Sequence, residues 1–159
     1  MKITIVCAGK LKERYLQDGI AEFLKRLRPF ADVAIREVRE EKMPDAPPAA
    51  EKAQVLAREG EKLLHLVPDG SHLIVLDVYG AEKSSEELAA ELDRLAQSGK
   101  SSVTFLIGGA FGLSDAVRRA ADLCLSFSRM TFTHQMVRLL LVEQIYRAFK
   151  INRGEKYHW

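Results

Sequence analysis

The feature of this sequence that most restricts its fold is a regular alternation between short apolar runs and longer segments of helical periodicity. The short runs are rich in β-branched and aliphatic residues, as buried strands are, and cover residues 2–9, 32–40, 72–80, 102–109 and 123–128. The helical segments are residues 12–28, 49–67 and 135–150, a helix capped by Ser84 with Glu87 completing a capping box, and a short helix capped by Ser114. Strands alternating with helices predict an α/β fold in which helices sandwich a mainly parallel sheet. With 159 residues, the chain is expected to form one domain over residues 1–159.

Neither end of the chain carries a pattern typical of export or membrane insertion. Within residues 1–9 a lysine is followed by apolar residues, but Lys10, Lys12, Glu13 and Arg14 come next without a small-residue cleavage site, so no signal peptide is expected. No run approaches the roughly 18 apolar residues that a membrane span needs. The protein is therefore expected to be cytoplasmic and not to bind a membrane.

The spacing of cysteines and histidines argues against a metal site. Cys7 and Cys124 each stand alone in an apolar stretch and are expected to be buried and reduced. The histidines show no metal-ligand spacing, either among themselves or with the cysteines, at positions His65, His72, His134 and His158. No metal is expected.

The positive charge of the chain is concentrated in its C-terminal part. Residues 118–159 carry eight Lys and Arg against three Asp and Glu, although the whole chain has a formal net charge of only +2. A segment of this kind suits a polyanion, because neutralised phosphates supply most of the affinity for nucleic acid. A solvated basic helix explains the same pattern equally well.

Ligands of parallel α/β sheets bind beyond the carboxyl ends of the strands, which directs attention to residues 76–80, 107–112 and 126–133. The second segment belongs to LIGGAFGLSD, where Gly108, Gly109 and Gly112 stand between a buried strand and a capped helix. Glycines there let a backbone approach a ligand and leave amides free to donate, but they also suit a plain sharp turn. The pattern is not GxGxxG, so dinucleotide binding is disfavoured.

The last helix, within SFSRMTFTHQMVRLLLVEQIYRAF, is apolar on nearly every face. Such a helix must be covered on several sides, which predicts a homodimer. Arg138 stands in an apolar stripe and is expected either to pair with a carboxylate or to contact an anionic ligand. Glu143 and Arg147 are spaced for an ordinary ion pair along the helix.

Two groups near the ends of this helix are candidates for chemistry. His134 stands at its start, where a capping role and a functional role are equally good interpretations. The terminal Tyr157, His158 and Trp159 follow the basic helix, and their rings are able to stack on a base, although terminal residues are commonly frayed.

In order and spacing, LIGGAFGLSD, SFSRMTFTHQMVR, LLLVEQIYRA and the terminal Tyr157-His158 resemble the ribosomal large subunit methyltransferase H family, as do the opening KITIVCAGK and the VLDVYG strand. The resemblance implies a SPOUT-type α/β fold with a C-terminal trefoil knot, a homodimer, and S-adenosylmethionine as cofactor. It also implies 23S ribosomal RNA as partner, in the ribosome or its large subunit. Carried over to this chain, the cofactor contacts fall on Leu76, Gly108, Phe127, Ser128, Arg129, Met130, Thr131 and Phe132.

The reaction implied by the resemblance is methylation of N3 of a pseudouridine. This nitrogen carries a proton and is a poor nucleophile until the proton is lost, so a base or a nearby cation is required. The expected catalytic residues are His134, Arg138, Tyr157 and His158. Two alternatives stay open: a nucleotide-binding α/β enzyme that holds a phosphate with LIGGAFG, and a non-catalytic ribosome-binding or assembly module.

Overall fold

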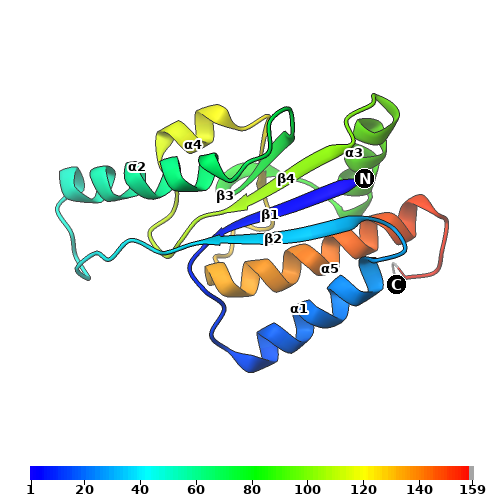
Figure 1. Cartoon of the computed structure of the whole chain (residues 1–159), viewed down its shortest axis with the longest axis horizontal. Coiled ribbons are helices and arrows are strands. Elements are labelled where there is room, and N and C mark those ends of the chain that lie inside the picture. Colours follow the sequence, from blue (N-terminus) through cyan, green and yellow to red (C-terminus); the bar gives the residue numbers. More distant parts are fainter. Residues whose placement is uncertain (158–159) are drawn as a thin grey trace.

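A computed structural model describes residues 1–157 as five parallel strands with helices on both faces (Figure 1). The predicted α/β class and mainly parallel sheet are confirmed. The elements are β1 (Lys2–Ala8), α1 (Arg14–Leu27), β2 (Asp32–Val38), α2 (Ala49–His65), β3 (His72–Glu82), α3 (Ser85–Gln97), β4 (Ser102–Ile107), α4 (Asp115–Ala120), β5 (Leu123–Ser126) and α5 (His134–Asn152).

The strands follow the order β2-β1-β4-β3-β5, so β4 lies in the centre between β1 and β3. This position explains why β4 is apolar almost throughout: it is covered on both faces and by a strand on each side. The exposed edge strand β2 instead alternates between half-buried and exposed residues. The trefoil knot expected from the family resemblance stays a prediction.

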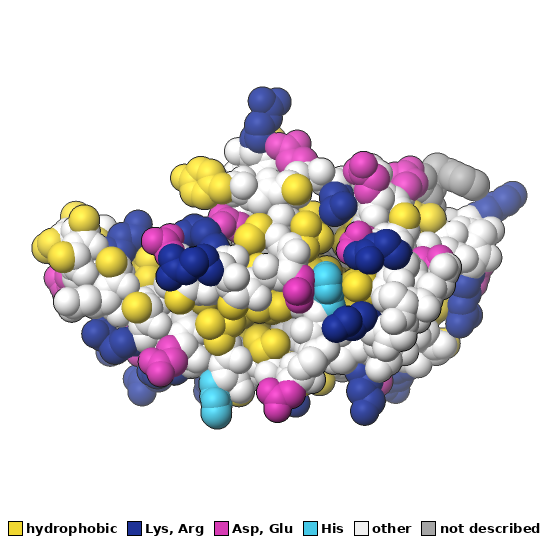
Figure 2. All heavy atoms as spheres, turned by 90° about the horizontal axis from the view of Figure 1, so that it is seen from above, with side chains coloured by type: hydrophobic (Ala, Val, Ile, Leu, Met, Phe, Trp, Pro, Cys, Tyr) yellow, Lys and Arg dark blue, Asp and Glu magenta, His cyan; other side chains and the backbone are white. Residues whose placement is uncertain are grey.

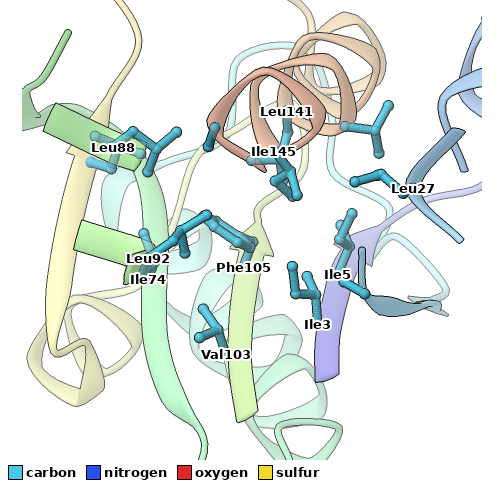
Figure 3. Close-up of a cluster of buried hydrophobic side chains, with 14 of the residues drawn as sticks. Ile3, Ile5, Leu27, Ile74, Leu88, Leu92, Val103, Phe105, Leu141 and Ile145 are labelled. Carbon is cyan, nitrogen blue, oxygen red and sulfur yellow. The ribbon is translucent and has the colours of Figure 1, made fainter. Parts of the chain in front are cut away.

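Alternate side chains of the strands belong to two separate hydrophobic cores, one on each face of the sheet. Ile5 of β1 and Phe105 of β4 point toward α1, α3 and α5, as the close-up in Figure 3 shows. Val6 and Leu106, one position along, belong to the core under α2 and α4. Burying each such side chain contributes roughly 1.5–3 kcal/mol, so the sheet is held firmly from both faces and its strand ends form a rigid platform.

Helix α5 lies between α1 and α3 on one face of the sheet, and this placement accounts for its unusual composition. Leu141, Val142 and Ile145 are fully buried against the sheet, while Leu139 and Tyr146 pack at the sides. Two neighbouring helices of the same chain therefore cover the flanks of α5, and the homodimer expected from its composition stays a prediction.

Helix starts follow the predicted caps, whereas one strand runs past its expected end. Ser84 and Glu87 form the reciprocal capping box, and Ser114 accepts a hydrogen bond from the backbone of the α4 start. Thr133, not His134, caps α5. The strand expected to stop at residue 80 continues to Glu82, because a bulge after Leu76 lets it resume pairing with β5.

Candidate functional site

The register of the sheet brings three predicted strand ends together. Leu76 of β3 pairs with Ile107 of β4 on one side and with Leu125 of β5 on the other. The segments that follow these residues therefore start side by side. They border a cleft of about 1520 Å³, to which the start of α2 and the loop before α1 also contribute.

The glycine-rich turn after β4 forms one wall of the cleft. Gly109 and Gly112 form an antiparallel bridge, and Gly112 has a φ of 92°, a conformation that favours glycine. A Cβ on Gly108 would lie 2.6 Å from Cδ2 of Leu113 and 2.8 Å from the Gly112 carbonyl oxygen. Gly108 lines the cleft as expected, but the packing of the turn itself already requires a residue without a side chain at this position.

Carboxylates occupy the back of the same turn. The amide of Ala110 donates to Oε1 of Glu40 (3.0 Å), and the amide of Gly112 donates to the Gly109 carbonyl (3.2 Å). Glu59 is only 4% exposed, and burial raises the pKa of its carboxyl group while the backbones of Glu41 and Gly109 act in the opposite direction. Two carboxylates beside the turn make it a poor site for a phosphate.

The bulge of β3 forms a second wall. Asp77, which follows Leu76, accepts a 2.5 Å hydrogen bond from Nε of Arg118 and another from the Tyr79 amide (3.2 Å). Arg118 also donates to the carbonyl oxygen of Leu113 (3.0 Å), at the end of the glycine turn. The hydrogen bond that Arg118 donates to Asp77 raises the pKa of the Arg118 guanidinium. Arg118 thus joins the end of β3 to the glycine turn.

The loop between β5 and α5 closes the cleft. Ser128 accepts a hydrogen bond from the Met130 amide (3.0 Å), and its carbonyl accepts one from Oγ of Ser126 (3.1 Å), so the loop is held by its own side chains. Arg129 is 94% exposed and lies 4.0 Å from Glu82. The other expected cofactor contacts all line the cleft, namely Leu76, Gly108, Phe127, Ser128, Met130, Thr131 and Phe132.

The three candidate catalytic residues that the structure describes do not lie together in one chain. His134 lines the cleft, with a side chain that is 16% exposed and an Nε2 that lies 4.0 Å from Oε2 of Glu40. Arg138, one turn further along α5, is buried and donates to Glu37 (2.5 Å) and to the Gly9 carbonyl (3.0 Å). The ion pair between Arg138 and Glu37 agrees with the prediction that Arg138 pairs with a carboxylate.

Tyr157 packs against the C-terminal half of α5. Its carbonyl accepts from Arg147 (3.1 Å), whose guanidinium also lies 4.8 Å from the tyrosine ring centre, and the ring meets Tyr146 edge to face. Burial and the nearby charge of Glu143 raise the pKa of Tyr157. Its contacts on α5 lie nine to thirteen positions beyond His134, at Glu143, Tyr146 and Arg147, which corresponds to roughly 14–20 Å along the helix axis. His158, the remaining candidate, lies outside the described residues.

The basic charges of the C-terminal part are distributed along several elements. Arg118, Arg138 and Arg147 are held by carboxylates, Arg147 in the predicted pair with Glu143, and Lys150 is bound to Glu155. In Figure 2 cationic, anionic and hydrophobic side chains are intermixed on the face shown. On the side of the molecule that Figure 2 shows, the described residues therefore do not form one continuous basic face.

Several residues that border or support the cleft were not singled out from the sequence: Glu40, Glu59, Asp77 and Arg118. The position of Asp77 directly after a strand end was an available signal, since such positions face ligands in parallel sheets. Glu40 and Glu59 carried no such signal, because their contacts join segments that are distant in sequence.

Among residues 1–157 there is no cluster of three His, Cys, Asp or Glu suited to a metal ion. No helix within that range is long and apolar enough to cross a membrane.

Comparisons with known proteins agree over almost the whole chain. Residues 1–158 match the family described as "Predicted SPOUT methyltransferase". The chain is 55% identical over 158 residues to the ribosomal RNA large subunit methyltransferase H of Listeria monocytogenes serotype 4b (strain CLIP80459), covering 99% of both proteins. It is 56% identical over 160 residues to the protein of that name from Symbiobacterium thermophilum, again covering 99% of both.

Solved structures support the fold. A "Probable Methyltransferase" from Bordetella pertussis Tohama I has a TM-score of 0.54 at 15% identity, with 92% of this chain and 95% of that one covered. A "probable methylase family protein" from Haemophilus influenzae Rd KW20 has a TM-score of 0.51 at 12% identity, with 99% and 70% covered.

Proposed function

The chain belongs to the ribosomal RNA large subunit methyltransferase H family of SPOUT methyltransferases, and from this premise we propose that it transfers a methyl group from S-adenosylmethionine to N3 of a pseudouridine in 23S ribosomal RNA. The observation that carries the proposal is the cleft at three adjoining strand ends. Seven of the eight residues expected to contact the cofactor line it. A ribosomal substrate also implies that the protein acts in the cytoplasm.

The residues of the cleft fit this cofactor better than they fit a phosphorylated one. The Ala110 amide already donates its hydrogen bond to the Glu40 carboxylate, and the buried Glu59 lies next to Gly109. The turn therefore presents acidic groups at a place where a phosphate would need hydrogen-bond donors. S-adenosylmethionine carries a positive sulfonium, which this environment favours. Apolar groups for the adenosine come from Leu76, Phe127 and Phe132. The nucleotide-binding alternative is therefore disfavoured.

When bound, the cofactor would supply an electrophilic methyl group for an in-line displacement. The protein's own task is to hold the acceptor base close and aligned, to exclude water and to accept the proton of N3. His134 is the described candidate for the base, since its imidazole lines the cleft. Arg138 is assigned a supporting role, because its guanidinium binds Glu37 and the Gly9 carbonyl inside the protein.

We also propose that the active form is a homodimer with shared sites. Tyr157 packs on Tyr146 and Arg147, more than three turns of α5 beyond His134, and it does not line the cleft of its own chain. A second copy brings a tail to the cleft. The exposed side chains of Val78, Tyr79, Met130 and Phe132, on the β3 bulge and the β5–α5 loop, suit such an interface.

The decisive experiment is methylation of large ribosomal subunits from cells that lack the modification, with labelled S-adenosylmethionine as donor. We expect one methyl group per subunit, mapped to N3 of a pseudouridine in 23S ribosomal RNA, and cofactor binding in titration calorimetry. Binding of subunits without methyl transfer would support the assembly-module alternative. Methylation at another nucleotide or atom would disprove the proposed target.

A further inference from the structure

Glu40, two residues beyond the end of β2, contacts two parts of the site that come from distant segments. Its Oε1 accepts the hydrogen bond from the Ala110 amide (3.0 Å) in the glycine turn. Its Oε2 lies 4.0 Å from Nε2 of His134, the first residue of α5. One carboxylate thus faces the wall of the cofactor cleft and the candidate base together.

Two glycines show how closely the chain is fitted around this carboxylate. A Cβ on Gly109 would lie 2.8 Å from Oε1 of Glu40, closer than side chains approach one another. A Cβ on Gly9, where φ is 80°, would lie 3.2 Å from Oε2 of Glu40 and 3.4 Å from Nε2 of His134. Backbone from the ends of β4 and β1 therefore packs directly on both oxygens.

The surroundings restrict where this carboxylate can move. The amide of Glu41, the next residue, donates to the buried Glu59 (3.1 Å), which fixes the backbone beside Glu40. Arg138 donates to the Gly9 carbonyl (3.0 Å), which fixes the segment on the other side. The Glu40 carboxylate is therefore enclosed by anchored backbone, although 36% of its side chain remains exposed.

We propose that Glu40 is a positioning residue for the reaction: it holds the Gly109–Ala110 turn through one oxygen and orients the imidazole of His134 through the other. The inference rests on the proposed function, since it assigns His134 and the turn to methyl transfer. A negative oxygen facing Nε2 also stabilises the positive charge that the imidazole acquires when it accepts a proton.

Two substitutions separate the two contacts. Glu40→Gln keeps an oxygen that can accept from Ala110 but removes the charge facing His134, whereas Glu40→Ala removes both. Glu41→Gln is the matched control, because the Glu41 side chain binds Lys62 (2.6 Å) away from the turn. Three quantities are measured: hydrogen exchange of the Ala110 amide in the cofactor-free protein, the affinity for S-adenosylmethionine by calorimetry, and kcat on undermethylated subunits.

In Glu40→Ala we expect exchange of the Ala110 amide to rise by about 10-fold or more, cofactor affinity to fall by about 5-fold and kcat to fall by about 100-fold. In Glu40→Gln the exchange rate and affinity should stay within about 3-fold of wild type while kcat falls by about 10-fold. Glu41→Gln should match wild type in all three measurements.

Unchanged exchange of Ala110 in Glu40→Ala would overturn the contact with the turn, and unchanged kcat in Glu40→Gln would overturn the role toward His134. The exchange measurement needs neither cofactor nor RNA. Failure of the wild-type protein to bind S-adenosylmethionine or to methylate would instead disprove the proposed function, and the exchange data would still decide whether Glu40 holds the turn.

Discussion

Nε of Arg118 donates a 2.5 Å hydrogen bond to Oδ2 of Asp77, and this pair joins α4 to the bulge at the end of β3. Arg118 also donates a hydrogen bond to the Leu113 carbonyl. One side chain therefore contacts both the end of β3 and the end of the glycine turn, which form two walls of the cleft. Their separation therefore depends on a contact outside the strands themselves.

Replacing Arg118 with Met should loosen the cleft without unfolding the protein. The variant leaves the Asp77 carboxylate, which is only 5% exposed, without its cation, so the bulge should rearrange. We expect affinity for S-adenosylmethionine to fall by about 10-fold in calorimetry, with an unchanged circular dichroism spectrum. The control is Asp115→Asn, because Asp115 is 83% exposed at 3.5 Å from Arg118. Equal affinities in Arg118→Met and wild type would refute this role.

Much of the fold follows from local patterns, because the signals are short-range. The apolar run of β4, the capping box of Ser84 and the cap of Ser114 each depend on residues within a few positions, and the structure has all three. The convergence of the strand ends was also predictable, since parallel strands place their carboxyl ends at one edge.

The long-range contacts were not predictable in the same way. The sequence left Arg138 with two interpretations, because only the folded chain shows that Glu37 lies beside it. The sequence indicated that α5 is covered on several sides but not that α1 and α3 are its neighbours, since helical periodicity describes an apolar face and not what packs against it. Glu40 reaches Ala110 across 70 positions of sequence, a contact that no local pattern encodes.

Arg138→Met should act mainly on stability. The substitution leaves the Gly9 carbonyl and part of the Glu37 carboxylate without a donor inside the protein, which costs roughly 2–3 kcal/mol of unfolding free energy. Urea unfolding followed by circular dichroism measures this loss, and Arg147→Met, in a half-exposed pair on the same helix, serves as a comparison that should lose less. A variant with wild-type stability and abolished methylation would instead make Arg138 a catalytic residue.

Glu59 should make stability depend on pH. Burial raises the pKa of its carboxyl group in the folded protein, so the folded state holds the proton more tightly than the unfolded state does. Stability from this group is then fully present below the unfolded pKa and is lost as the pH rises through the folded pKa. We expect Glu59→Gln to gain stability relative to wild type in urea unfolding as the pH rises from the unfolded pKa of a glutamate, about 4.3, toward neutral. A constant difference between the two proteins across this range would contradict the shift.

The two thiols should differ in reactivity. Burial raises the pKa of Cys7 to about 12, so almost no thiolate forms near neutral pH and the sulfur is also inaccessible. Cys124 is only half-buried, and burial followed by the charge of Asp77 raises its pKa as well. Titration of the native protein with a thiol reagent at about pH 8 should modify Cys124 slowly and leave Cys7 intact. Unfolding in denaturant should release both, and Cys124→Ser should react only when unfolded.

The terminal residues provide the sharpest test of the shared site. Tyr157 is half-buried and packed on Tyr146 and Arg147, so it is not a frayed end. If the tail completes the cleft of a second copy, a deletion of residues 157–159 should leave dimerisation and cofactor affinity nearly intact. Methylation should fall by about 100-fold or more, the scale of lost base and lost positioning. His158→Ala then separates the histidine from the aromatic neighbours.

Mixing two inactive variants decides which chain supplies the tail. One variant lacks residues 157–159 and keeps its cleft, and the other, Thr131→Trp, fills its cleft with an indole but keeps its tail. In a mixed dimer, an intact cleft meets an intact tail only if each tail serves the partner chain. When half of the dimers are mixed, each of these has one working site out of two. Activity should then recover to about a quarter of wild type. No recovery, despite exchange of subunits shown by mass measurement, means that each tail folds back to its own cleft. That outcome would require Tyr157 to leave Arg147 and move roughly 20 Å along α5 toward His134 during each reaction.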